Sequence, residues 1–121
     1  MDVGNDKYIP TDDYPDFAAL AAGKVSLDPE NSLGILICGS GVGVDIAANK
    51  FKNVRSALAF NAEQAAAARS DDNTNVLSLA ADYLDEDSAK KILSVWLATN
   101  FSGEERHQRR LRKIEDIETR I

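Results

Sequence analysis

Residues 34–50 read GILICGSGVGVDIAANK, an apolar run that leads directly into a glycine-rich turn and then into a segment compatible with a helix. An uninterrupted apolar run ahead of Gly39 is typical of a strand that is buried on both faces of a sheet. Glycines allow the main chain to approach a ligand, and open α/β sheets bind ligands at the carboxyl ends of their strands. This stretch therefore predicts an α/β fold with an anion-binding loop after its strand.

The alternation of strand and helix repeats along the chain. Apolar runs occur at residues 33–38, 54–60 and 75–80. Each is followed by a helix-compatible segment, at residues 42–50, 62–69 and 87–98. Short apolar strands joined through helices indicate parallel strands with helices on both faces of the sheet, so we expect the α/β class of fold.

Both ends of the chain carry a further predicted helix. Residues 14–22 have Pro15 in the first turn and Gly23 as the stop signal. A charged helix begins at about Glu104, and its apolar residues recur every three or four positions: Leu111, Ile114, Ile117 and Ile121. Because such a stripe must be buried, we expect residues 103–121 to form an interface helix on a partner subunit.

The number of strands is low for this class of fold. Doubly wound sheets usually contain five or six parallel strands, whereas three are recognisable here. We therefore expect an N-terminally shortened sheet that lacks an opening βα unit; a small three-layer domain is the alternative. The 121 residues are otherwise suited to one domain, residues 1–121.

Composition excludes several classes of protein. With 14 basic and 20 acidic side chains the net charge is -6, which argues against a nucleic-acid partner. The longest uncharged stretch, residues 31–44, is interrupted by glycines and is shorter than the roughly 20 apolar residues of a membrane span. One cysteine and no signal-peptide pattern predict a reducing, cytoplasmic location.

Cys38 is the first candidate for chemistry because it stands at the carboxyl end of the first strand. A lone cysteine is often a small buried apolar residue. Next to a helix start and a loop of main-chain amides, however, its thiolate can act as a base or nucleophile. Ser40 could pass a proton or simply form the turn. The G-x-G-x-G spacing lacks the third glycine of a dinucleotide fingerprint, and there is no Walker A sequence.

Two polar clusters lie elsewhere in the chain. Arg106 and Arg110 are one helical turn apart and could hold one phosphate, although a solvated charged face is the alternative. His107 is the only histidine, and such a residue is more often structural than catalytic. The turn at residues 69–75 enters the third strand at its amino end. Only a neighbouring subunit could then bring that turn to the glycine loop.

Taken in order, these motifs resemble the ribose-5-phosphate isomerase B family, which includes subunits of galactose-6-phosphate isomerase. The resemblance runs from Asp13 to about Ile117, and its specific pieces are residues 34–43, 47–50, 73–77 and 106–108. It implies a Rossmann-like three-layer fold and a homodimer or a dimer of dimers with active sites between subunits. It also implies interconversion of aldose and ketose phosphates, above all ribose 5-phosphate and ribulose 5-phosphate, with no metal and no cofactor.

The resemblance also implies roles for individual residues. Cys38 would be the base that moves a proton between C1 and C2, and Ser40 would shuttle the hydroxyl proton. The amides around Gly39, Gly41, Val42 and Gly43 would hold the enediolate. Tyr14 and Asn73 would line the pocket. Arg106 and Arg110 would bind the sugar phosphate, at least one of them from a partner chain.

Three features depart from the family pattern. No strand ending in Asp-His-Ala-Gly precedes the glycine loop, Asp71 replaces a histidine that helps to open the sugar ring, and Asp82 replaces an arginine. Asp71 could still act as a general acid if burial kept its carboxyl protonated. A second interpretation is a non-catalytic phosphosugar-binding or partner subunit of an isomerase complex. A third is a flavodoxin-like module that binds a mononucleotide or a phosphoprotein.

Overall fold

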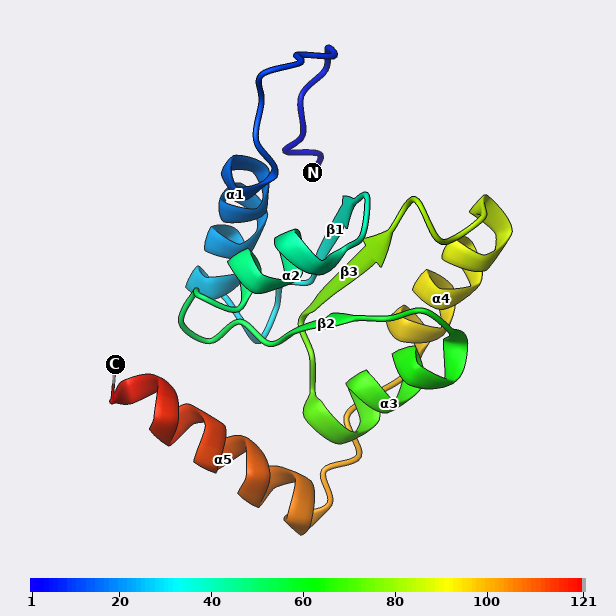
Figure 1. Ribbon diagram of the computed structural model, residues 1–121. Helices are drawn as coiled ribbons and strands as arrows, with labels where there is room; N and C mark the ends of the chain where they lie inside the picture. The colour runs from blue at the N-terminus through cyan, green and yellow to red at the C-terminus, as the bar shows by residue number, and fades with distance from the viewer. Residues whose placement is uncertain (121) are drawn as a thin grey trace.

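The computed structural model of the protein describes residues 1–120 and contains three strands and five helices in that range (Figure 1). In chain order the elements are α1 (Tyr14–Leu27), β1 (Gly34–Cys38), α2 (Val42–Ala48), β2 (Ser56–Leu58), α3 (Ala62–Asp72), β3 (Val76–Ala80), α4 (Glu86–Ala98) and α5 (Glu105–Thr119). The predicted alternation of strands and helices is therefore confirmed.

The three strands form a parallel sheet in the order β1-β3-β2. All five residues of the central strand β3 are buried, and their side chains alternate between the two faces. Val76 packs with Leu36 against α1 and α2, whereas Leu77 and Leu79 pack with Ile92 and the other apolar residues of α3 and α4. Helices therefore cover both faces of the sheet, as predicted for a three-layer α/β fold.

Two predicted boundaries were wrong. Helix α1 passes through Gly23 and ends at Leu27, because Ala22 and Val25 are both buried in the core and hold the last turn in place. A helix interior tolerates a glycine when packing compensates for its low propensity. Strand β2 is shorter than residues 54–60, since the Asn75 side chain accepts from Arg55 N at 2.8 Å and takes over part of the pairing.

Asn49 covers the outer edge of β2. Its carboxamide donates to Ser56 O at 3.0 Å and accepts from Ser56 N at 2.9 Å, so the side chain replaces a neighbouring strand. Edge strands with unpaired main-chain groups invite association with other chains, and a local side-chain partner prevents it. The chain itself thus pairs the first residue of β2 on the outer edge of the sheet.

Helix α5 extends away from the body of the molecule (Figure 1). Its side chains Ile114 and Ile117 are 48% and 56% exposed, so the predicted apolar stripe is largely uncovered in a single chain. Ile121, the last member of that stripe, lies outside the described residues. Within residues 1–120, no helix is both long enough and apolar enough to cross a membrane.

Candidate active site

Cys38 is the last residue of β1, partly buried and with a free thiol. Its carbonyl accepts a hydrogen bond from Ala81 N at 2.9 Å, which fixes the main chain at the carboxyl end of the sheet. The residues Gly39–Gly43, here named the glycine loop, follow immediately and lead into α2. The thiol and the loop therefore lie where parallel sheets bind ligands.

Glycine is required at two positions of this loop. Gly41 has φ 75°, and a Cβ at this position would lie 2.5 Å from Leu58 Cδ1 and 3.1 Å from the main chain of Leu79. A Cβ at Gly43 would collide with the ring of Tyr14, which starts α1. The half-exposed Tyr14 ring is thus held directly against the glycine loop.

Ser40 forms part of the turn. Its Oγ accepts from Val42 N at 3.3 Å, so the hydroxyl supports the entry into α2. This contact agrees with the turn role that the sequence left open. It also leaves the hydroxyl hydrogen to donate to another group.

Asp82 lies on the glycine loop, a contact that sequence analysis missed. Asp82 N donates to Gly39 O at 2.9 Å, and a Cβ at Gly39 would lie 2.6 Å from Asp82 Oδ2. Asp82 forms no ion pair with any group in residues 1–120. A carboxylate therefore stands beside the loop at the position where the family resemblance implies an arginine.

The second group of candidate residues surrounds the end of α3. Asn73 has φ 46°, caps α3 and accepts from Arg55 Nε through its carbonyl at 2.7 Å. The Asp71 side chain is 49% exposed, and its Oδ1 lies 3.7 Å from His107 Nε2. The burial that would favour Asp71 as a general acid is therefore incomplete in a single chain, and its role stays a prediction.

His107 connects α5 to this group. The side chain is 5% exposed, and its Nδ1 lies 2.6 Å from Ser102 Oγ. The ring is therefore held between Ser102 on one side and Asp71 on the other. Such a fixed, buried imidazole has the structural character expected of a lone histidine.

Arg106 and Arg110 are both exposed on α5. Arg106 lies 3.6 Å from Glu104, whereas Arg110 forms no ion pair with residues 1–120. Their neighbours Arg109 and Arg112 both contact Glu105, so the predicted solvated charged face is present in part. The guanidinium of Arg110 is thus available to an anion.

The structure does not bring these two groups together within one chain. The glycine loop lies at the carboxyl end of the sheet, whereas Asp71, Asn73 and α5 lie at its amino end (Figure 1). The sequence predicted this separation from the direction of the strands. A complete site that uses both groups therefore requires two chains.

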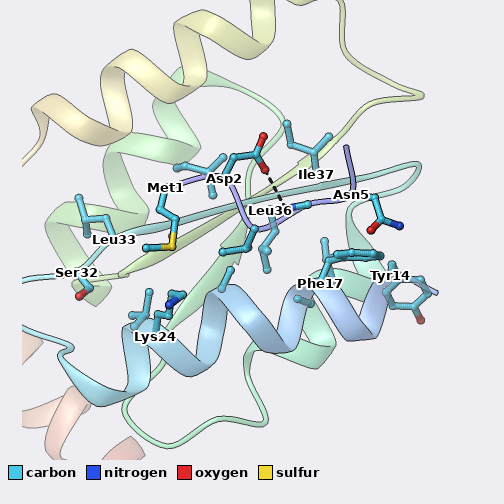
Figure 2. Close-up of a pocket in the computed structure, with 18 of the residues that line it drawn as sticks. Met1, Asp2, Asn5, Tyr14, Phe17, Lys24, Ser32, Leu33, Leu36 and Ile37 are labelled. Atoms are coloured by element: carbon cyan, nitrogen blue, oxygen red, sulfur yellow. Dashed lines mark hydrogen bonds between the residues drawn. The ribbon is translucent and has the colours of Figure 1, made fainter. Parts of the chain in front are cut away.

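A groove of about 890 Å³ runs along β1 (Figure 2). Residues Met1–Asn5, the α1 side chains Tyr14 and Phe17, and the strand as far as Ile37 line it. The β1 residues that line the groove end at Ile37, one residue before Cys38. One end of the groove therefore lies close to the candidate active site.

Comparison with known proteins identifies the family of the chain. The family model described as "Ribose/Galactose Isomerase" matches residues 1–114. The chain belongs to this family. A probable ribose-5-phosphate isomerase B of Mycoplasma genitalium is 48% identical over 94% of this chain and 74% of its own length, and the ribose-5-phosphate isomerase B of Escherichia coli is 40% identical over 89% and 71%.

Solved structures of the family have the same fold. The M. genitalium ribose-5-phosphate isomerase B with bound ribulose 5-phosphate gives a TM-score of 0.94 at 46% identity, covering 98% of this chain and 78% of that one. The Clostridium thermocellum isomerase gives 0.92 at 36% identity, covering 99% and 79%. The family resemblance and the Rossmann-like α/β fold predicted from the sequence are confirmed.

A partly buried polar cluster that joins α2 to β2 and β3 was also missed. Ser56 Oγ donates to Asp45 Oδ1 at 2.6 Å and lies 3.1 Å from Ser78 Oγ. Burial raises the pKa of the Asp45 carboxyl, and the hydrogen bonds from the two serines oppose this shift. The sequence signal that could have indicated this cluster is the presence of Ser56 and Ser78 within apolar runs. In this isomerase the cluster supports the helix that follows the glycine loop.

No group of three or more histidine, cysteine, aspartate or glutamate side chains in residues 1–120 is arranged to hold a metal ion.

Proposed function

We propose that the chain interconverts ribose 5-phosphate and ribulose 5-phosphate, with Cys38 as the base. The observation that carries this proposal is the thiol at the carboxyl end of β1, followed at once by the glycine loop. Membership of the isomerase family over residues 1–114 and the similarity to an isomerase with bound ribulose 5-phosphate support it. No metal and no cofactor enter the proposed chemistry.

The proposed reaction transfers one proton between neighbouring carbons. The Cys38 thiolate removes the proton from C2 of the open aldose, and the electron pair moves to the carbonyl to give an enediolate. The same sulfur returns the proton to C1, while a hydroxyl proton passes from O2 to O1. Amides of the glycine loop stabilise the developing negative charge, and the Ser40 hydroxyl relays the proton between the two oxygens.

We further propose that each active site is shared by two chains. Cys38, Tyr14 and the glycine loop would come from one subunit, and Asn73, Asp71 and the two arginines from the other. The uncovered stripe of α5 supports this arrangement, because Ile114 and Ile117 require an apolar partner. The assembly would be a homodimer or a dimer of dimers in which residues 103–121 form the interface helix.

The proposed chemistry also bears on the domain organisation and the cellular location of the protein. We propose that residues 1–121 act as one domain in the cytoplasm, where a reducing environment keeps the catalytic thiol available. The substrate is a small sugar phosphate, and neither nucleic acid nor a membrane takes part.

A non-catalytic phosphosugar-binding subunit is the second candidate. The Asp82 carboxylate beside Gly39 favours it, because a negative charge at the loop opposes an enediolate. The half-exposed Asp71 also favours it, since ring opening then lacks a buried acid. Such a subunit would bind the sugar phosphate and show no turnover.

Substitution of the single cysteine tests the enzyme proposal. Cys38→Ala should lower kcat by about a hundredfold or more while circular dichroism and ribose 5-phosphate binding by calorimetry stay near the parent's. Because the chain has one cysteine, iodoacetamide labels only Cys38, and saturating ribose 5-phosphate should slow that labelling. Retention of turnover by Cys38→Ala contradicts the assignment of the base. Binding with no turnover by the parent supports the second candidate.

A further inference from the structure

Two side chains of helix α2 bind the same residue of the edge strand β2. The Asn49 carboxamide donates to Ser56 O at 3.0 Å and accepts from Ser56 N at 2.9 Å, and Asp45 Oδ1 accepts from Ser56 Oγ at 2.6 Å. Asp45 and Asn49 are one helical turn apart, so they lie on the same face of α2. These three residues are named the α2–β2 clamp. Three hydrogen bonds to a single residue fix both the distance and the rotation of α2 relative to β2.

The clamp continues to the centre of the sheet. Ser78 is fully buried in β3, and its Oγ lies 3.1 Å from Ser56 Oγ. A serine hydroxyl has one hydrogen, and Ser56 donates its hydrogen to Asp45. Ser78 therefore donates to Ser56, which gives a chain of hydrogen bonds from β3 through β2 to α2. Because a hydrogen bond to a carboxylate is stronger than one between neutral groups, Asp45 anchors this chain.

The clamp lies one helical turn from the glycine loop. Asp45 N donates to Gly41 O at 3.3 Å, so the residue that binds Ser56 through its side chain binds the loop through its main chain. A Cβ at Gly41 would lie 2.5 Å from Leu58 Cδ1, so the loop rests on the last residue of β2. The clamp binds Ser56, the first residue of the same strand. The position of the loop therefore depends on how α2 is seated on β2.

The loop has few side chains with which to fix itself. Three of its five residues are glycines, and the Val42 side chain is 47% exposed. The Ser40 hydroxyl accepts from Val42 N and thus bonds within the loop. Because the seven residues of α2 span only about 10 Å, a tilt of about 5° at Asp45 displaces the loop by on the order of 1 Å. Misplacement by about 1 Å can lower a reaction rate about a hundredfold.

The position of Asp45 does not favour a carboxylate. Burial raises the pKa of the Asp45 carboxyl, and the hydrogen bonds from Ser56 and Ser78 offset this shift only in part. Residues that break a local preference are expected at functional sites, where the cost in stability is compensated elsewhere. This cost indicates that Asp45 serves more than the stability of the fold.

We propose that Asp45 is a positioning residue for the isomerase reaction, which through Ser56 holds α2 and the glycine loop at the distance from the Cys38 sulfur that proton transfer requires. The inference rests on the proposed function, in which the loop stabilises the enediolate. Asp45 acts through the loop and does not touch the substrate. The role requires an acceptor atom at the position of Oδ1, so asparagine can replace aspartate, whereas leucine has a similar shape but no acceptor.

Two substitutions at Asp45 test the proposal in the full chain. Asp45→Leu should lower kcat for ribose 5-phosphate by about tenfold or more and change KM by less than about twofold, because the loop acts on charge that develops in the transition state. Asp45→Asn keeps the acceptor and should retain kcat within about twofold. The matched control is Glu63→Leu, which removes an exposed acidic residue from the first turn of α3 and should leave kcat unchanged.

Ser56 provides the reciprocal test, which also applies if Asp45→Leu impairs folding. Ser56→Ala removes the hydroxyl and leaves the two main-chain bonds to Asn49, and it should lower kcat by about threefold to tenfold. The double variant Asp45→Leu/Ser56→Ala should lose no more activity than the weaker single variant, since both changes break one contact. Losses that multiply in the double variant contradict a shared role.

Main-chain NMR provides a measurement that does not depend on turnover. The amide signals of Gly41 and Gly43 should shift in Ser56→Ala, although Ser56 lies outside the loop, and should keep their parental positions in Glu63→Leu. A parent without turnover contradicts the proposed function, and the amide signals then still test whether the clamp positions the loop. Unshifted loop signals in Ser56→Ala, or parental kcat in Asp45→Leu, overturn the proposal. An equal loss of kcat in Asp45→Asn and Asp45→Leu also overturns it, because the charge would then be responsible.

Discussion

The Asp82 carboxylate lies over Gly39, so close that a Cβ at Gly39 would be 2.6 Å from Asp82 Oδ2. The contact places the negative charge of Asp82 beside the main chain of the glycine loop, which follows the candidate base Cys38. A neighbouring carboxylate repels an anionic substrate, and the repulsion between exposed charges is modest because water screens it.

Replacing this charge should improve substrate binding. Asp82→Asn is expected to lower KM for ribose 5-phosphate by about threefold to fivefold, and Asp82→Arg should lower it further through attraction. Steady-state kinetics at low ionic strength provides the measurement. Glu86→Gln, which removes an exposed charge on α4, is the control and should leave KM unchanged. A rise in KM for Asp82→Asn would show instead that the carboxylate accepts a hydrogen bond from the sugar.

Mixing two inactive variants should restore activity if the sites are shared between subunits. Cys38→Ala disables one half of each site and Arg110→Ala the other half, so a mixed dimer keeps one intact site. After denaturation together and refolding, equal amounts are expected to recover about a quarter of the parental turnover. Turnover no higher than the sum of the separate variants would contradict shared sites. Arg109→Ala, which loses only an exposed contact to Glu105, is the matched control and should remain active alone.

The partly buried Asp45 cluster should make the free energy of unfolding depend on pH. Burial raises the pKa of Asp45 above its ordinary value of 3.8, so the folded state holds the proton more tightly than the unfolded state. The stabilisation from this group is complete below the unfolded pKa and is lost as pH rises through the folded pKa. Asp45→Asn removes this contribution, and its stability should therefore fall less between about pH 3 and about pH 7.

Urea unfolding at several pH values measures this difference. The control is Asp87→Asn, an exposed carboxyl on the first turn of α4, which should keep the pH dependence of the parent. An Asp45→Asn variant whose unfolding midpoints follow the parent at every pH would show that Asp45 does not cause the dependence.

Local sequence patterns predicted most of the fold. The apolar run around Leu77 correctly predicted a strand that helices cover on both faces. The run around Leu36 correctly predicted a parallel strand, but only one of its faces is covered, since Ile35 and Ile37 are 37% and 63% exposed. The end of α1 was not predicted, since Gly23 is a stop signal by propensity and only the tertiary burial of Ala22 and Val25 overrides it.

The candidate site was predicted where its residues are close in sequence. Cys38 and the glycine loop follow one another, so a strand that ends in a turn was enough to identify them. The contacts of Asp82 with Gly39, and of Asn49 with Ser56, join separate elements. The periodicity of apolar residues along the sequence does not encode such contacts, because they depend on how the strands are ordered in the sheet.

The indole of Trp96 offers a built-in optical probe of the second group of site residues. Trp96 is the only tryptophan, it is fully buried, and its Nε1 donates to Thr74 Oγ1 at 3.0 Å, one residue after Asn73. The Arg69 guanidinium lies 5.2 Å from the centre of the same ring. Any rearrangement of this turn when a partner chain or a sugar phosphate arrives will change the surroundings of one fluorophore, so emission can follow assembly in real time without a label.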